Sequence, residues 1–113
     1  MRAVLRPLAV TDIEDAAQYY EAAEAGLGGR VLDAVDAALR HIEHNPKAGS
    51  SRYEHVIAGV RMMRTETFPY LLFYLVHDDL IDVLRVLHMK RDLAQLLDGE
   101  EQKKPSNKGG QGS

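Results

Sequence analysis

The sequence predicts an α+β domain in which an N-terminal helical hairpin packs on one face of a small antiparallel sheet. Two observations predict this fold. Residues 68–88 contain two nearly continuous apolar runs, rich in aromatic and β-branched residues, on either side of a short polar turn. Runs that are apolar on both faces belong in the middle of a sheet that helices cover. Residues 11–44 instead place small apolar residues at helical spacing, and glycines interrupt the pattern once.

Composition narrows the class of protein. The 113 residues suit one domain, and the 45% of hydrophobic residues allow a small core. The absence of cysteine excludes disulfides, thiolate metal sites and a cysteine nucleophile, and it fits a reducing cytoplasm, where we expect the chain to act. The chain has no apolar run of membrane-spanning length, and its first ten residues do not form a signal peptide. The net charge of −3 disfavours bulk binding to nucleic acid.

The first element in order is a short strand over residues 3–6, which Pro7 should end. Thr11 is expected to open the first helix, because Thr11 and Glu14 have the spacing of a capping box. Acids in this first turn also suit the positive end of the helix dipole. The glycines at positions 26, 28 and 29 should end this helix.

The second helix is expected over about residues 30–44, since Asn45-Pro46 cannot continue it. Residues 47–57 read as a loop. The strands that follow should make an antiparallel meander over residues 60–67, 68–76 and 80–88. One short helix after Asp92 should complete the order β-α-α-β-β-β-α. We expect one domain over residues 1–97 and a disordered tail over residues 98–113, which has no large apolar residue.

Most catalytic and metal-binding patterns have weak support. The serines lie in a loop or in the tail, without the strand–turn–helix elbow of a serine hydrolase. His41 and His44 could share a helix face, yet histidines near a helix C-terminus more often meet the negative end of the dipole. We therefore expect no metal and no cofactor.

One basic constellation remains, with two readings that residue types alone do not separate. It comprises Arg61, Arg85, His88 and Arg91, with Tyr70 and Tyr74 nearby. An arginine inside an apolar strand is costly unless it is paired, so Arg85 could bond Asp82 or a helix carboxylate. Alternatively, arginines on an uncovered sheet face could bind an anionic partner. RNA cleavage would need a base, an acid and a cation, for which His88 and the arginines are candidates.

Five segments occur in order along residues 4–97 that are typical of one family. They are residues 7–13 (PLAVTDI), 44–46 (HNP), 59–61 (GVR), 68–74 (FPYLLFY) and 82–92 (DVLRVLHMKRD). Together they resemble the RelE/ParE superfamily of bacterial type II toxins, and most of all its ParE branch. The resemblance implies a small toxin that a cognate antitoxin, encoded beside it, neutralises within a toxin–antitoxin hetero-oligomer.

The resemblance also implies a choice of targets. ParE-like members poison DNA gyrase by protein binding, whereas RelE-like members cleave mRNA in the ribosome and are usually strongly basic. The acidic balance here favours the ParE side, so we expect a toxin that is not an enzyme. The alternatives are a metal-independent, ribosome-dependent endoribonuclease using Arg61, Arg85, His88 or Arg91, and a decayed relative that is no longer toxic.

The expected partner-binding residues lie in the strands and just beyond them. Antitoxins of this family lay helices or a strand along the toxin, so leucines that a small domain cannot cover are candidate contacts, although each could simply complete the core. The expected set is Arg61, Arg64, Tyr70, Arg85, His88, Arg91, Leu93, Leu96 and Leu97.

Overall fold

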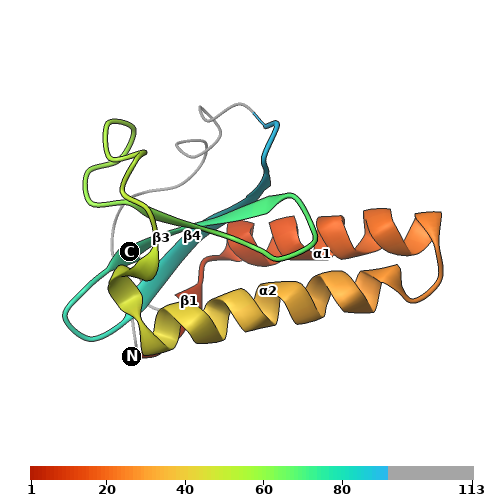
Figure 1. The fold of residues 1–113 in the computed structure, drawn as a ribbon, viewed down its shortest axis with the longest axis horizontal. Coiled ribbons are helices and arrows are strands. Elements are labelled where there is room, and N and C mark those ends of the chain that lie inside the picture. Colours follow the sequence, from red (N-terminus) through yellow and green to blue (C-terminus); the bar gives the residue numbers. More distant parts are fainter. Residues whose placement is uncertain (92–113) are drawn as a thin grey trace.

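A computed structural model describes residues 1–91 and confirms the α+β fold (Figure 1). Its elements are β1 (Ala3–Leu5), α1 (Pro7–Ala23), α2 (Leu27–His44), the 3₁₀ turn η1 (Pro46–Ala48), β2 (Arg61–Arg64), β3 (Tyr70–Val76) and β4 (Ile81–His88). The predicted order is confirmed through the last strand. The helix expected after Asp92 and the tail expected over residues 98–113 lie outside the described residues. Neither helix of the described part offers an apolar stretch that could cross a bilayer.

The four strands form one mixed sheet in the order β1-β4-β3-β2. The expected antiparallel meander is confirmed for β2, β3 and β4. The expectation of a wholly antiparallel sheet is wrong for β1, which runs parallel to β4. Parallel neighbours need a long crossover connection, and the helical hairpin is part of the connection that joins β1 to the other strands.

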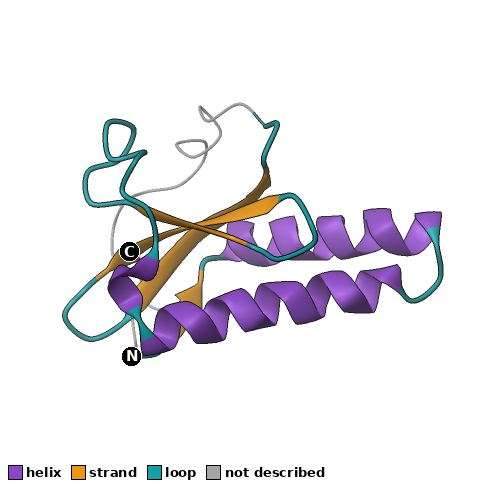
Figure 2. Ribbon diagram, viewed as in Figure 1, coloured by secondary structure: helices purple, strands orange, loops and turns teal. Residues whose placement is uncertain are grey.

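The sheet has an apolar core on each face. On one face Leu72 and Tyr74 of β3 pack with Ile13 of α1 and Val35 of α2. The opposite face, which sequence reasoning left open, carries Phe73 and is covered by residues of the loop 49–60, including Ile57 and Val60 (Figure 2). That loop has no helical or strand period, so its apolar side chains gave no signal of where they would pack.

The first helix begins earlier than its predicted start. Pro7 occupies its first turn and Arg6 precedes it in extended conformation, so α1 is already formed when the chain reaches Thr11. Proline suits the first turn because its φ is fixed near helical values and its missing N–H would have no partner there. The capping box expected at Thr11 and Glu14 is therefore wrong.

The turn between the helices is held by a carboxylate. Glu21 of α1 accepts hydrogen bonds from the N–H groups of Gly26 and Gly28, at 3.0 and 2.8 Å. These two bonds lower the pKa of Glu21. Gly26 has a φ of 94°, which glycine adopts without strain, and α2 begins at once at Leu27 instead of near residue 30. A Cβ on Gly28 would lie 2.7 Å from the carbonyl oxygen of Ala17, so glycine here lets the helices meet.

Tyr74 fastens the segment after α2 to the middle of the sheet. Its hydroxyl donates to the carbonyl oxygen of Pro46 at 2.8 Å and accepts from the N–H of Gly49 at 2.9 Å. The ring is fully buried, and burial raises the pKa of Tyr74. The polar end of a core residue thus fixes where the chain leaves the hairpin.

We predict that Gly49→Ala destabilises the fold by about 1–3 kcal/mol, a typical cost of overpacking. The new Cβ would lie 2.4 Å from the hydroxyl oxygen of Tyr74, although the φ of −69° at Gly49 is one that alanine accepts. Gly29→Ala is the matched control, because nothing lies within 4 Å of its Cβ and α2 should gain up to about 1 kcal/mol. Urea unfolding of both variants measures the difference, and equal midpoints would contradict the prediction.

Candidate functional site

The basic side chains expected to act together lie in three separate places. Arg85 is tied to α1, Arg61 lies beside the segment after α2, and His88 lies with Tyr70 at the other end of β3. The register fixes this separation, because Tyr74 faces Arg61 while Tyr70 faces His88. Leu93, Leu96 and Leu97 lie outside the described residues.

Arg85 forms a two-pronged ion pair with Asp12 of α1. Its Nε and Nη2 donate to the two carboxylate oxygens at 2.8 and 2.9 Å, and Arg85 is only 7% exposed. The same carboxylate accepts the N–H of Val86 at 2.9 Å. A register shift places one extra residue, Leu84, directly before Arg85, and such bulges redirect the neighbouring side chain. Pairing with a helix carboxylate, one of the two readings from the sequence, is therefore confirmed, and Arg85 offers no open cation.

Asp82, the other predicted partner of Arg85, pairs elsewhere. It is completely buried, and its carboxylate accepts from Nε and Nη2 of Arg6 at 2.9 and 2.8 Å. Nε2 of His77 lies 3.2 Å from the same carboxylate. The interior of the sheet thus contains two arginine–carboxylate pairs, and each one links the N-terminal segment to β4.

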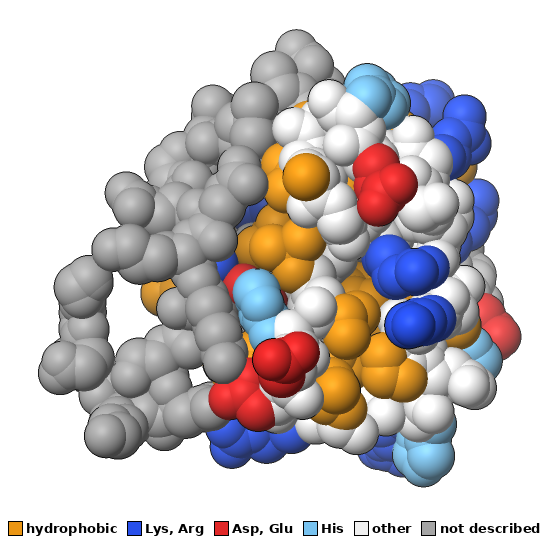
Figure 3. All heavy atoms as spheres, turned by 90° about the vertical axis from the view of Figure 1, so that its left-hand side faces the viewer, with side chains coloured by type: hydrophobic (Ala, Val, Ile, Leu, Met, Phe, Trp, Pro, Cys, Tyr) orange, Lys and Arg blue, Asp and Glu red, His pale blue; other side chains and the backbone are white. Residues whose placement is uncertain are grey.

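Arg61 and Arg64 lie on β2, the edge strand. Nη1 of Arg61 donates to the carbonyl oxygens of Lys47 and Gly49, at 3.1 and 2.9 Å, so it mainly holds the loop. Arg64 is exposed. Ser50 pairs with Met62 on the outer side of this strand, and alternation turns the N–H and C=O of Arg64 to the same outer side. Figure 3 views the left-hand end of Figure 1, where Lys and Arg side chains lie beside hydrophobic ones.

A chain of aromatic rings occupies the opposite end of the sheet. Tyr70 meets His88 edge to face at 5.4 Å and Tyr20 at 6.3 Å, and Tyr20 meets Tyr19 at 5.3 Å. Burial raises the pKa of Tyr70, while the positive charge of Arg91 acts in the opposite direction. Tyr19 is 71% exposed. The sequence analysis did not single out Tyr19, although two consecutive tyrosines on an amphipathic helix already place one ring inward and one outward.

The turn between β2 and β3 is strained. Thr67 has a φ of 73°, and the N–H of Phe68 bonds the carbonyl oxygen of Glu66 at 2.8 Å across it. A β-branched residue rarely adopts this conformation, which occurs in tight three-residue turns. The hydroxyl of Thr65 donates to the carbonyl oxygen of Phe68 at 2.6 Å and holds the turn closed. The turn keeps Phe68 edge-on against Tyr20, with ring centroids 5.0 Å apart.

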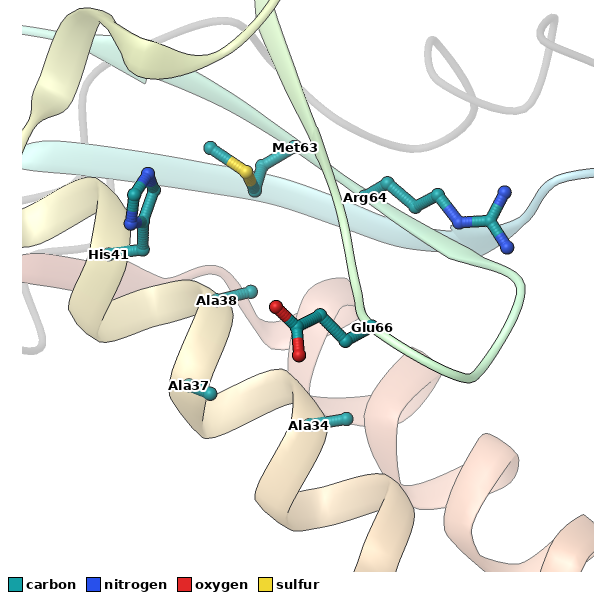
Figure 4. A pocket seen from close by; sticks show the side chains of 7 residues that line it. All are labelled: Ala34, Ala37, Ala38, His41, Met63, Arg64 and Glu66. Carbon is teal, nitrogen blue, oxygen red and sulfur yellow. The ribbon is translucent and has the colours of Figure 1, made fainter.

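A groove of about 240 Å³ runs between α2 and the edge strand β2 (Figure 4). One wall is made of small side chains from α2, and Met63 and Glu66 face it from the other side. The lining residues are Ala34, Ala37, Ala38, His41, Met63, Arg64 and Glu66. Alanines leave room for the side chains of a partner, and the ionisable groups at the rim can fix its orientation.

The arrangement provides two surfaces on which a partner could bind. Within residues 1–91, no three histidine or acidic side chains come together as a metal site. Arg85, one of the cations considered for a phosphate, is buried and already bonds Asp12. What the surface does offer is an alanine-walled groove on one side and an aromatic cluster with basic neighbours on the other.

Comparison with known proteins agrees with this fold. The sequence matches the family described as "ParE toxin of type II toxin-antitoxin system, parDE" over residues 3–93. Among solved structures, the fold is similar to a chain of the chromosomal ParDE TA system from P. aeruginosa. The TM-score is 0.61 at 20% identity, and the match covers 80% of this chain and 97% of that one. At this identity the likeness concerns the fold. A comparison with curated protein sequences gives no match.

We predict that Asp12→Ala lowers the free energy of unfolding by about 3 kcal/mol or more, because it removes the carboxylate from a buried guanidinium and from the N–H of Val86. Asp36→Ala is the control, since Asp36 pairs with Arg40 on the exposed face of α2, where a pair contributes at most about 1 kcal/mol. Chemical denaturation of the two variants measures both effects. Similar small losses would show that the Asp12–Arg85 pair does not anchor α1 to the sheet.

Proposed function

This chain belongs to the ParE toxin family of type II toxin-antitoxin systems, and we propose that it arrests growth by binding DNA gyrase in the cytoplasm. We further propose that a ParD-type antitoxin neutralises it by occupying the groove between α2 and β2. In this account the toxin performs no covalent chemistry. Its effect comes from a protein surface that holds gyrase.

The separation of the basic side chains supports binding over RNA cleavage. A ribonuclease of this type needs a base, an acid and a cation around one phosphate. Of the candidate cations, Arg61 bonds loop carbonyls at the end of the sheet away from His88 and Arg85 is paired with Asp12, which leaves Arg91 on the side of His88 and Tyr70. The net charge of −3 adds a general repulsion of the phosphate backbone.

The groove supports the antitoxin assignment through its shape and its rim. Its alanines can receive larger apolar side chains from a partner helix or strand. The exposed backbone of Arg64 on the edge strand can pair with an added strand, and Arg64 and Glu66 offer one charge of each sign. We therefore expect a partner segment with apolar side chains flanked by charges of both signs.

We predict that Ala37→Arg weakens antitoxin binding at least about tenfold, because it fills the groove with a long side chain. Losing a central contact of an interface typically weakens binding by this much. Leu32→Arg is the control, since Leu32 is exposed on the same helix and does not line the groove. Titration calorimetry with the antitoxin encoded beside the toxin gives the affinities. Equal affinities for wild type and Ala37→Arg would place the antitoxin elsewhere.

We predict that the purified toxin inhibits supercoiling by gyrase, and that growth arrest by wild type leaves cellular mRNA uncut because His88 performs no chemistry. Supercoiling assays, and mapping of mRNA ends after controlled expression, measure the two effects. Loss of toxicity in His88→Ala, together with mRNA cuts mapped in cells, would instead establish the endoribonuclease. Expression of wild type without growth arrest would identify a decayed relative.

A further inference from the structure

We propose that Tyr19 and the basic residues after β4 form the surface that grips the toxin's target, separate from the antitoxin groove. The surface is the aromatic cluster of Tyr19, Tyr20, Tyr70 and His88 together with Lys90. The partner chemistry it fits is an acidic protein surface that also carries an apolar side chain. This inference rests on the proposed function, since it names the part of the toxin that would contact gyrase.

Neighbouring rings support Tyr19 from within the fold. Its ring stands edge-on against Tyr20 at 5.3 Å, and Tyr20 in turn meets both Phe68 and Tyr70. The strained turn at Thr67 fixes Phe68, so the stack rests on a rigid hairpin. A large aromatic side chain that is 71% exposed yet held from behind costs little conformational entropy when a partner covers it.

Basic residues lie around the aromatic cluster. Beyond the paired Arg85, the segment from His88 to Arg91 carries three side chains that can be cationic and no acid, on a chain whose net charge is −3. Lys90 is exposed, and its N–H bonds Nδ1 of His88 at 3.1 Å, which ties the basic segment to the ring stack. Met89, 44% exposed, adds apolar area beside it.

The acidic residues of α1 could cancel this positive charge. Asp12 is bonded to Arg85, and Glu21 accepts from the amides of the hairpin turn, so both serve contacts inside the fold. Glu14 and Asp15 remain exposed about one turn before Tyr19. The surface therefore attracts carboxylates on the side of β4, where electrostatic complementarity would orient a partner.

A protein partner fits this surface better than a nucleic acid. Base stacking needs exposed ring faces, whereas Tyr20 and Tyr70 meet their neighbours edge to face and Tyr70 is nearly buried. One exposed tyrosine that is joined through a ring stack to a basic segment resembles the anchor of a protein interface, where tyrosine and arginine concentrate the binding energy. The groove between α2 and β2 shares no residue with this cluster.

The test uses four variants of the full chain in gyrase supercoiling, antitoxin binding and growth assays. Tyr19→Ala and Lys90→Glu each alter the cluster. Leu32→Ala removes an exposed apolar side chain elsewhere, and Lys47→Glu makes the same change of charge at the opposite end of the sheet. Thermal unfolding checks that all four remain folded, which the exposure of each side chain leads us to expect.

We expect Tyr19→Ala and Lys90→Glu to raise the concentration needed for half-inhibition of gyrase about tenfold, and to leave antitoxin affinity within about twofold. Both controls should match wild type in each assay. If wild type inhibits gyrase and Tyr19→Ala and Lys90→Glu inhibit it equally well, the proposed surface is wrong while the proposed function stands.

A wild type that arrests growth but leaves gyrase untouched would overturn the proposed function alone. Growth arrest then tests the surface, because Tyr19→Ala and Lys90→Glu should relieve it and the two controls should not. Arrest unchanged by either cluster variant would overturn the surface. A gel-shift assay with RNA is added for wild type and Tyr19→Ala, and RNA binding by wild type that is lost in Tyr19→Ala would overturn the choice of a protein partner. A wild type without any toxicity would overturn both inferences.

Discussion

The carboxylate of Asp12 is the contact on which the assembly of the two layers depends. It lies on α1, yet it pairs with Arg85 and accepts the N–H of Val86 on a central strand. β1 pairs with β4 only over Ile81 to Val83, so the strand edge beyond it would otherwise present unmet backbone groups. One acidic side chain therefore closes the sheet edge, neutralises a buried cation and sets the position of the hairpin. The Arg6–Asp82 pair likewise ties the segment before α1 to β4.

Local patterns in the sequence were sufficient to predict most helices and strands, but they did not predict which charged side chains pair. The apolar runs of β3 and β4, and the end of α2 at Asn45-Pro46, follow from rules that act within a few residues. The pairing of Arg85 with Asp12 joins positions 73 apart in the chain, so no local pattern could choose it over Asp82. Pro7 shows the other limit, since a residue expected to end a strand also begins a helix.

Residue types in the sequence nominate candidate side chains, whereas the register of the sheet decides which of them lie together. Tyr70 and His88 lie together because antiparallel register brings the start of β3 to the end of β4. The positive charge of Arg91 acts on the same residue, since it opposes the rise in the pKa of Tyr70. Arg61 joins the loop instead, since the register places it opposite Tyr74. The groove and Tyr19 escaped prediction because each depends on how α1 and α2 lie against the sheet, which periodicity alone does not specify.

The short bridge between Ser50 and Met62 bears on how readily other chains can add to the outer edge of β2. Unprotected edge strands are templates on which further copies of a protein add and precipitate. Here the loop already occupies part of the outer edge of β2, and an exposed arginine marks the rest. This edge is thereby protected in part against the addition of further copies, while a partner that brings its own complementary charge could still add to the remaining backbone.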